Sequence, residues 1–548
     1  MVEFDTIQTM DSAAIFLPND TDKLKAEVIQ LRDVVKENER TIDEKKQRIE
    51  QLLDYILLLR KRQFGSSSER FNKDQLNLFD EAELEQLLEE LAPPADLDEE
   101  TSSTQKQEKT EKKKPVRRPL PAHYNRIEKI IDISDEEKAA MGGDWVLIGY
   151  DKSEQLAVIP RQHYVIEFKR AKYAPKNDEV IGAEQGVVIA PRADQIIPKS
   201  IAHSSVIADV MTQKFVDGLP FYRQEKIYAR EDVDLSRQTM SGWVIQLHEK
   251  LSPLMQLIKR QLYGGKVLHI DETRLQVLNE PGKENTQLSY IWVYVGGPPD
   301  NPVVWHQYAD SRAGHVPMDF LYPEVGSDDA TDPDWSLTIM TDGYSGYNAL
   351  HEMPGIKGHA ACWAHVRRKF VDAAAGRKNQ AAAHQMVALI GKLYLIERSA
   401  KDKTPEERKE IRQSLSQPIL DKIKTWLDSK AGKVLPKSLL GKAIHYALGL
   451  WPQLIIYVDD GNIPIDNNPA ENAVRPFVIG RKAWLFSGSP RGAHASATLY
   501  TLVETAKANQ LEPWAYLNHL FEKLPAAKSE QALLALMPQN LRMEDLNS

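Results

Sequence analysis

Apolar residues recur every seven positions between residues 22 and 62, with leucines at most of the interleaved positions. The first core position is occupied by Val28, Val35, Ile42, Ile49 and Ile56. β-Branched residues at one core position, leucine at the other and Asn38 in an interleaved slot favour a parallel two-stranded coiled coil. We therefore expect residues 1–70 to form a dimerisation helix with a basic end. The alternative is an amphipathic helix packed on its own domain.

The pattern changes twice before residue 200. Residues 71–122 are charged and poor in aromatic residues, which is typical of a linker. Between 123 and 198, short alternating runs such as DWVLIGY and RQHYVIEFKRAKY predict a small β-rich module.

Residues 199–262 change to a helical pattern. LPFYRQEKIYAR (219–230) is followed, after a short turn, by SRQTMSGWVIQLHEK (236–250), which begins at the good N-cap residue Ser236. This is the layout of a helix-turn-helix, and Arg237 and Gln238 at the start of its second helix are candidate DNA contacts. Two packed helices joined by a turn also occur in many proteins that do not bind DNA.

Five strand-like runs follow, in LHIDETRLQVL (268–278), QLSYIWVYVGG (287–297), PVVWHQYAD (302–310), SLTIMTDGYSGYNAL (336–350) and GHAACWAHVRRKF (358–370). A helix is expected near 313–322, and the last run continues into another. Three antiparallel strands followed by alternating helices and strands is the ribonuclease-H-like order. In that order the first and fourth strands are neighbours, so Asp271 and Asp342 should meet at one end of the sheet.

The predicted fold is therefore α/β and multidomain. Its ribonuclease-H-like core has a first part, 263–371, and a second part, 461–525, followed by a C-terminal tail, 526–548. Between the two parts, residues 372–460 are rich in Ala, Leu, Lys and Glu, which predicts an all-helical insertion. Such an insertion would shape a DNA channel or act as a stabilising appendage.

Composition narrows the class of protein. Hydrophobic residues make up 42% and charged residues 27% of the chain, as in soluble globular proteins, and the net charge of −9 argues weakly against one uniformly basic DNA-coating surface. The single Cys362 excludes an intrachain disulfide framework. Without a long apolar run or a signal-peptide pattern, the chain is expected to be cytoplasmic and associated with the nucleoid, with no membrane partner.

Carboxylates supply the candidate chemistry. Two aspartates held together repel each other unless a cation neutralises them, and magnesium prefers carboxylate oxygens. Two ions about 3.5–4 Å apart can clamp an in-line phosphoryl displacement. Asp271 rather than the adjacent Glu272 is expected at the metals. Glu272 should point to the opposite face of the strand, toward Arg274 or Lys266.

A third acid, Glu471, lies in DNNPAENAVRPFVIGRKAWLFSGSPRGAHA (466–495). Asn467 or Asn468 is expected to cap a helix whose first turn contains Glu471. Arg475 lies at i+4 and would pair with Glu471 or reach a phosphate. Further candidate DNA contacts are basic residues after these acids, namely Arg367, Arg368, Arg481, Lys482 and Arg491.

These motifs resemble the DDE transposases of the insertion sequence 66 family. The resemblance rests on DET at 271, DGYSGY at 342, CWAHVRRKF at 362, NNPAENAVRPFVIGRKAWLFSGSPRGA at 467 and TAKANQLEPWAYL at 505, and it extends over nearly the whole chain. It implies cleavage and joining of a mobile DNA element by Asp271, Asp342 and Glu471. Two Mg²⁺ ions, with Mn²⁺ as a substitute, would be the cofactors.

The chain departs from the family in its β-rich module. Members usually carry two CxxC pairs there, whereas this chain has KAAMGG (138–143) and KYAPKND (172–178). We therefore expect no zinc, because the residues at those positions cannot rebuild a tetrahedral thiolate site. Cys362 and His365 have CxxH spacing without a second pair, so a structural role beside the acids is expected for them.

The resemblance implies double-stranded DNA, a homodimer and small accessory proteins of the same element as partners. Two other functions stay open. One is a DNA-binding regulator without catalysis, which loss of any acid would have indicated. The other is a nuclease on the same fold that lacks strand transfer.

Overall fold

The computed structural model describes residues 28–42, 45, 126–132, parts of 134–173, 188–322, 334–375 and 381–546. The chain divides into two compact units, one formed by residues 93–193 and the other by residues 1–92 together with 194–548. The larger unit contains the candidate acids.

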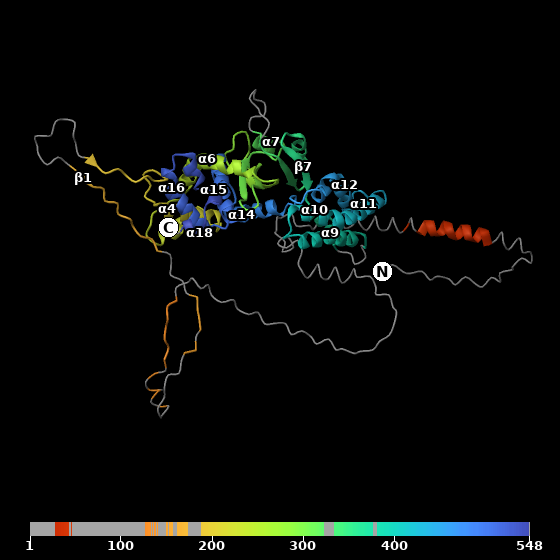
Figure 1. Ribbon diagram of the computed structural model, residues 1–548, viewed down its shortest axis with the longest axis horizontal. Coiled ribbons are helices and arrows are strands. Elements are labelled where there is room, and N and C mark those ends of the chain that lie inside the picture. Colours follow the sequence, from red (N-terminus) through yellow and green to blue (C-terminus); the bar gives the residue numbers. More distant parts are fainter. Residues whose placement is uncertain are drawn as a thin grey trace, which may run out of the picture. The chain divides into compact units, whose positions relative to one another are not determined.

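A five-stranded mixed sheet forms the centre of the larger unit (Figure 1). Its strands are β3 (Val267–Gln276), β4 (Leu288–Gly296), β5 (Val303–Ala309), β6 (Leu337–Thr341) and β7 (Ile356–Ala361). They lie in the order β5-β4-β3-β6-β7, with antiparallel pairing of β3, β4 and β5 and parallel pairing of β3 with β6 and of β6 with β7. The predicted pairing of the first and fourth strands is confirmed.

Both faces of the sheet are buried. In β4, Trp292 and Tyr294 contact aromatic side chains outside the sheet, with ring centroids 5.8 Å from Tyr347 and 4.0 Å from Phe320 respectively. Ile291 alternates with them and therefore points to the opposite face, where α14 (Asn468–Trp484) packs against β3 and β4. This explains why β4 reads as a continuous apolar run rather than an alternating one.

The helices α4 (Ser204–Phe215), α5 (Phe221–Ala229) and α6 (Arg237–Leu262) lead into the sheet. The predicted N-cap of α6 is confirmed, since Ser236 Oγ accepts a hydrogen bond from Thr239 N–H at 3.2 Å. The predicted apolar face of this helix is buried, from Met240 and Trp243 onward. The layout of helix, turn and helix is therefore present.

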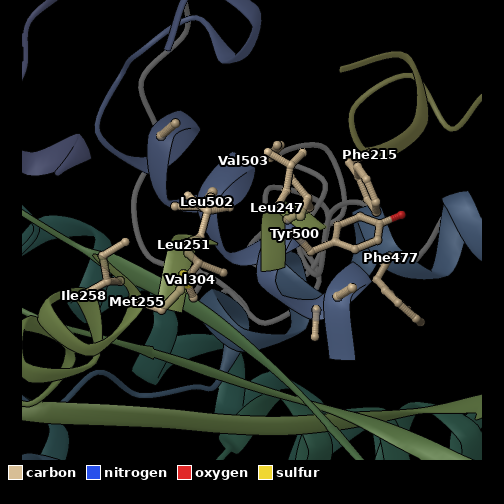
Figure 2. Packing of buried hydrophobic residues seen from close by; sticks show 14 of the residues in the cluster. Phe215, Leu247, Leu251, Met255, Ile258, Val304, Phe477, Tyr500, Leu502 and Val503 are labelled. Atoms are coloured by element: carbon tan, nitrogen blue, oxygen red, sulfur yellow. The ribbon is translucent and has the colours of Figure 1, made fainter. Parts of the chain in front are cut away.

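The helices α6 and α15 (Pro490–Ala508) share the main hydrophobic core with β5. Figure 2 shows Leu247 and Leu251 of α6 near Leu502 and Val503 of α15, with Val304 of β5 beside them. Thr501 and Thr505 of α15 bond to the backbone of β5, and the small residues Ala495 and Ala497 are buried in this core. The C-terminal segment continues as α16 (Pro513–Lys523), η6 (Leu524–Ala526), α17 (Glu530–Leu534), η7 (Pro538–Asn540) and α18 (Met543–Leu546).

A second core lies among the helices between β7 and α14. These helices are α8 (Trp363–Ala374), α9 (Ala381–Ser399), α10 (Pro405–Ile411), η4 (Arg412–Ser416), α11 (Gln417–Ala431), α12 (Leu439–Gly449), α13 (Trp451–Ile455) and η5 (Ile456–Val458). Buried Arg412 ties this segment to the chain leading into α14. It pairs with Glu397 at 2.6 Å and donates to the carbonyls of Tyr457, Asp460 and Ile463.

Two short helices lie in the connections between strands of the sheet. The helix α7 (His315–Leu321) follows β5, and η3 (Ser345–Glu352) follows β6. Both contribute aromatic rings to the face of β4 described above.

Outside this core, residues 28–42 form a helix whose predicted core side chains are exposed, including Val28 (46%), Val35 (55%) and Ile42 (50%). In the smaller unit, β1 (Lys172–Tyr173) pairs antiparallel with β2 (Val188–Ile189). DWVLIGY lies outside the described residues except for Tyr150, and in 162–173 only Lys172–Tyr173 forms a strand. Among the described helices, none has the length and apolar composition that a membrane span requires.

Candidate active site

Asp271 lies in β3, and Asp342 directly follows the neighbouring strand β6. The parallel ladder of β3 and β6 pairs His269 with Met340, and each aspartate follows two residues later. Residues in register on parallel strands point to the same face. The two carboxylates therefore emerge side by side at the end of the ladder, as the element order predicted.

Negative charges accumulate around Asp271. Burial, together with the charges of Glu272, Asp342 and Glu471, raises the pKa of Asp271 well above its ordinary value. The N–H of Glu272, which donates to Asp271 Oδ1 at 2.8 Å, offsets only part of this. Three carboxylates from distant parts of the chain thus act on one another electrostatically, with Asp271 at the centre.

Glu272 has a different partner from those predicted. Its side chain is 3% exposed, and its carboxylate accepts hydrogen bonds from Arg312 and from the Tyr347 hydroxyl. The prediction of Arg274 or Lys266 as partner is wrong, because the loop after β5 and the η3 helix cover this face of β3. Burial raises the pKa of Glu272 despite these two donors.

The turn after β6 orients Asp342. Tyr344 N–H donates to Asp342 Oδ1 at 2.9 Å, and Gly343 adopts φ +82°, which favours glycine. The hydroxyl of Tyr446 in α12 donates to the Asp342 carbonyl. The Arg312 guanidinium lies 4.0 Å from the Tyr344 ring centroid, so the Asp342 turn and the Glu272 ion pair are joined.

Glu471 lies in the first turn of α14, as predicted, but the cap differs. Asn467 occupies the N-cap position without a side-chain capping bond. Its side chain instead bonds to β3, with Oδ1 2.9 Å from His269 Nδ1 and Nδ2 donating to the Ile270 carbonyl at 2.9 Å. This contact fixes the start of the Glu471 helix against the strand that carries Asp271.

Cys362 and His365 surround Glu471. Their ligand atoms lie within 4.8 Å of one another and of a Glu471 oxygen, and His365 Nδ1 is 3.4 Å from Glu471 Oε1. The backbone N–H of Cys362 donates to the Thr341 carbonyl at 3.1 Å, and Asn467 N–H donates to Cys362 Sγ at 3.2 Å. Cys362 therefore joins the end of β6 to the start of α14. The CxxH spacing was the sequence signal for this role.

The protonation of this cluster argues against a thiolate. Burial, with the nearby charges of Glu471 and Asp466, raises the pKa of the Cys362 thiol well above its ordinary value. Burial also lowers the pKa of His365. Glu471 receives a charged partner from Arg368, whose Nη2 is 3.3 Å from Glu471 Oε2. This ion pair is a different one from the Arg475 pair considered in the sequence.

The predicted DNA contacts are dispersed. Arg237 and Gln238 are exposed at the start of α6, Lys482 is exposed on α14 and Arg475 is partly buried there. Arg368 contacts Glu471 and thus belongs to the acid cluster. By contrast, Arg367 is 6% exposed inside the helical core, so its guanidinium is not available to a DNA backbone and that predicted contact is not supported.

The two other predicted DNA contacts, Arg481 and Arg491, make contacts within the protein. Arg481 donates to Thr273 Oγ1 at 3.2 Å and to the Arg274 carbonyl, which holds the C-terminal half of α14 on β3. The exposed Arg491 pairs with Glu249 of α6. Sequence spacing alone did not indicate either partner.

Comparison with known families agrees with this arrangement. The model described as "Transposase IS66 family" matches residues 199–495, which is more than half of the 548 residues. The model "IS66 C-terminal element" matches 501–539. "Transposase C of IS166 homeodomain" matches 51–128, a stretch that overlaps the segment interpreted as a linker.

Relatives in Sinorhizobium fredii (strain NBRC 101917 / NGR234) cover most of the chain. The uncharacterized protein y4qI is 31% identical over 563 residues, which span 96% of this chain and 98% of that protein. The uncharacterized protein y4jD is 28% identical, over 78% of this chain and 82% of its own length. The chain therefore belongs to the insertion sequence 66 family of transposases.

Proposed function

We propose that this transposase cleaves the ends of an insertion sequence and joins the resulting 3′-hydroxyls to target DNA by metal-dependent phosphoryl transfer. Asp271, Asp342 and Glu471 are the proposed catalytic residues. The observation that carries the proposal is the convergence of these acids, through the register of β3 with β6 and the Asn467 contact, on one end of the sheet.

The donor set fits a divalent cation. Carboxylate oxygens are the ligands that Mg²⁺ and Mn²⁺ prefer. The pKa of Asp271 is raised first by burial and then by the charges of Glu272, Asp342 and Glu471, and a cation would balance that negative charge. We propose that Asp271, Asp342 and Glu471 would hold two Mg²⁺ ions, with Mn²⁺ as a substitute. Bound ions of this kind supply charge stabilisation of the attacking and leaving oxygens.

The surrounding residues hold the catalytic acids in position. The Tyr344 N–H orients Asp342, and Asn467 holds the helix of Glu471 on β3. For Glu471 to face a metal, its ion pair with Arg368 would have to rearrange, which would leave Arg368 near the reacting phosphate. A guanidinium there would neutralise phosphate charge and orient the DNA strand.

The sheet and its order of strands support a ribonuclease-H-like core within this proposal. A nuclease without strand transfer would use the same acids, so it is the alternative function. A regulator without catalysis is less well supported, since all three acids are present and close enough to influence one another.

We also propose that the transposase acts as a homodimer through its N-terminal helix. The described part of this helix, residues 28–42, exposes apolar side chains at the core positions of the heptad. Pairing with a second copy would bury them, and two copies would suit two element ends. Small accessory proteins of the element are proposed as further partners.

Strand cleavage of DNA carrying the element ends tests the catalytic proposal. Asp271→Asn, Asp342→Asn and Glu471→Gln should each reduce Mg²⁺-dependent cleavage by at least about 100-fold while binding to the same DNA is retained. Asp319→Asn, at an exposed position of α7, is the matched control and should cleave normally. Full cleavage by any one of the three variants would remove that acid from the site.

A further inference from the structure

A cavity of about 220 Å³ lies away from the acids, where the helix-turn-helix-like segment meets α14 and α15. Its walls come from distant segments and combine five aromatic rings with aliphatic side chains and four serines. The aromatic lining residues are Phe215, Phe221, Phe477, Trp484 and Phe486. Figure 2 shows two of them, Phe215 and Phe477, on either side of Tyr500. The volume is below the about 300–1,000 Å³ of sites for drug-sized ligands, so it suits a single planar ring system.

One lysine lies among these rings. Lys214 Nζ is 4.6 Å from the Phe221 ring centroid and 5.4 Å from that of Trp484. Among the described residues, none accepts a hydrogen bond from this ammonium or forms an ion pair with it. Burial lowers the pKa of Lys214 to about 8, so it remains mostly protonated at neutral pH. Cation–π contacts stabilise it, yet its N–H donors stay available to a ligand.

The rim of the cavity is an exposed apolar turn. Leu485 is 64% and Phe486 44% exposed, directly after α14. Leu485 has φ +69° and ψ −53°, and Phe486 N–H donates to the Trp484 carbonyl at 2.9 Å, which makes a strained γ-turn. Ser487 is bonded on both sides to the end of β3, through Gln276 and Leu278. The turn is therefore held rigidly with two large apolar side chains in solvent.

Basic residues flank the cavity in sequence. Arg237 precedes the lining residue Ser241 by one helical turn of α6. Lys482 lies two residues before Trp484, and Arg491 directly precedes the lining residue Gly492. Exposed cations close in sequence to the lining residues, of which Arg491 pairs with Glu249, would bind the nucleic acid backbone while aromatic rings stack its bases.

We propose that this cavity binds a single nucleobase unstacked from DNA, stacked against Phe486 and hydrogen-bonded by Lys214 through a carbonyl oxygen of the base. A base with a carbonyl oxygen, namely thymine, guanine or cytosine, is therefore preferred over adenine, whose acceptors are ring nitrogens. The proposal rests on the assignment of DNA as the substrate. The site is distinct from the acids, because Glu471 and Trp484 are thirteen residues apart on α14, or about 20 Å along a helix.

Binding of the full-length protein to three duplexes that differ at one extrahelical position tests this proposal. The position carries thymine, adenine or an abasic residue, and EDTA is present so that no result depends on phosphoryl transfer. We expect the thymine duplex to bind about tenfold tighter than the abasic duplex, equivalent to about 1.4 kcal/mol, with adenine in between.

Substitutions test separately the stacking on Phe486 and the hydrogen bond from Lys214. Phe486→Ala should bring the three affinities together without changing affinity for a fully paired duplex, and Phe486→Trp should retain the order. Lys214→Met should remove only the preference for thymine over adenine. Trp514→Ala is the matched control, since this ring is 38% exposed and does not line the cavity.

Equal binding of the thymine and abasic duplexes by the unmodified protein would overturn the proposal. So would an unchanged preference in Phe486→Ala. Neither result would affect the catalytic proposal, which the metal-dependent cleavage assay decides separately. Failure to bind any of the duplexes, including the paired one, would instead contradict DNA as the substrate and would overturn both.

Discussion

Asn467 Oδ1 lies 2.9 Å from His269 Nδ1, and both side chains are buried. Burial lowers the pKa of His269 to about 4, so the imidazole is neutral at physiological pH. Because Asn467 Nδ2 donates to the Ile270 carbonyl, Oδ1 is the acceptor and the histidine carries its proton on Nδ1. One amide thus joins the strand of Asp271 to the helix of Glu471.

Asn467→Ala should therefore weaken both the fold and catalysis. It leaves the Ile270 carbonyl and His269 without this partner, which costs about 1–3 kcal/mol in the free energy of unfolding. The start of α14 loses its attachment to β3, so we expect strand cleavage to fall by about tenfold or more. Urea unfolding and cleavage kinetics measure the two effects.

The neighbouring Asn468→Ala is the control for that substitution. Among the described residues, its side chain bonds only to Asp466, two positions earlier in the chain. Equal losses of stability and cleavage in both variants would show that the contact between Asn467 and His269 has no special part in positioning Glu471.

The stability of the metal-free protein should depend on pH through Asp271. Its pKa is higher in the folded than in the unfolded state, mainly because of burial. Stability from this group is therefore complete below the unfolded pKa, near 4, and is lost as pH rises through the folded pKa. Asp271→Asn removes that loss, so in EDTA it should raise Tm by a few degrees at pH 8 and have little effect at pH 4.

Thermal melting in EDTA across this pH range measures the difference. Asp319→Asn, in α7, should show no such trend. Added Mg²⁺ should raise Tm of the unmodified protein and leave that of Asp271→Asn almost unchanged, since the carboxylate is the proposed ligand. A constant difference in Tm between pH 4 and pH 8 would argue against a raised pKa of Asp271.

Removing Arg312 should destabilise the sheet through Glu272. The Glu272 side chain is 3% exposed, whereas that of Arg312 is 41% exposed and partly screened by solvent. Arg312→Met would leave a buried carboxylate with the Tyr347 hydroxyl as its one partner in the described part of the chain, at a cost of about 1–3 kcal/mol after allowing for that screening. In a double-mutant cycle, adding Glu272→Gln should restore part of the loss.

An exposed ion pair provides the comparison. Lys424 and Asp428 on α11 contact at 2.6 Å with side chains 39% and 54% exposed. Lys424→Met should change stability by no more than about 0.5 kcal/mol. If chemical denaturation gave the same small change for Arg312→Met, the buried pair would not contribute to the fold as proposed.

The proposed dimer depends on the heptad. Light scattering of the full chain should give twice the 62.2 kDa of one chain. Val35→Asp combined with Ile42→Asp should reduce this to the mass of one chain, because charges replace apolar side chains at the paired positions. Arg40→Asp, away from the core positions, should leave the dimer intact. A single-chain mass for the unmodified protein would exclude the coil as a dimerisation element.

The local pattern of the sequence determined the strands and helices of the core. The runs around Asp271 and Asp342 fold as β3 and β6 close to their predicted bounds, and Ser236 caps α6 as expected. These features depend on the alternation of apolar and polar residues, on apolar periodicity and on capping. Each of these involves only a few neighbouring residues, so it can be predicted without the rest of the chain. The order of elements then determined that the two aspartates are neighbours.

Only the tertiary structure decided the partners of each side chain. Glu272 bonds to Arg312 rather than to Arg274 or Lys266, which are close to it in sequence. Asn467 bonds to His269 of β3, far away in the sequence, and Arg367 is buried. The aromatic cavity around Lys214 unites segments more than 250 residues apart. Contacts of this kind depend on how separate elements pack, and a sequence pattern with a range of a few residues contains no information about which surfaces meet.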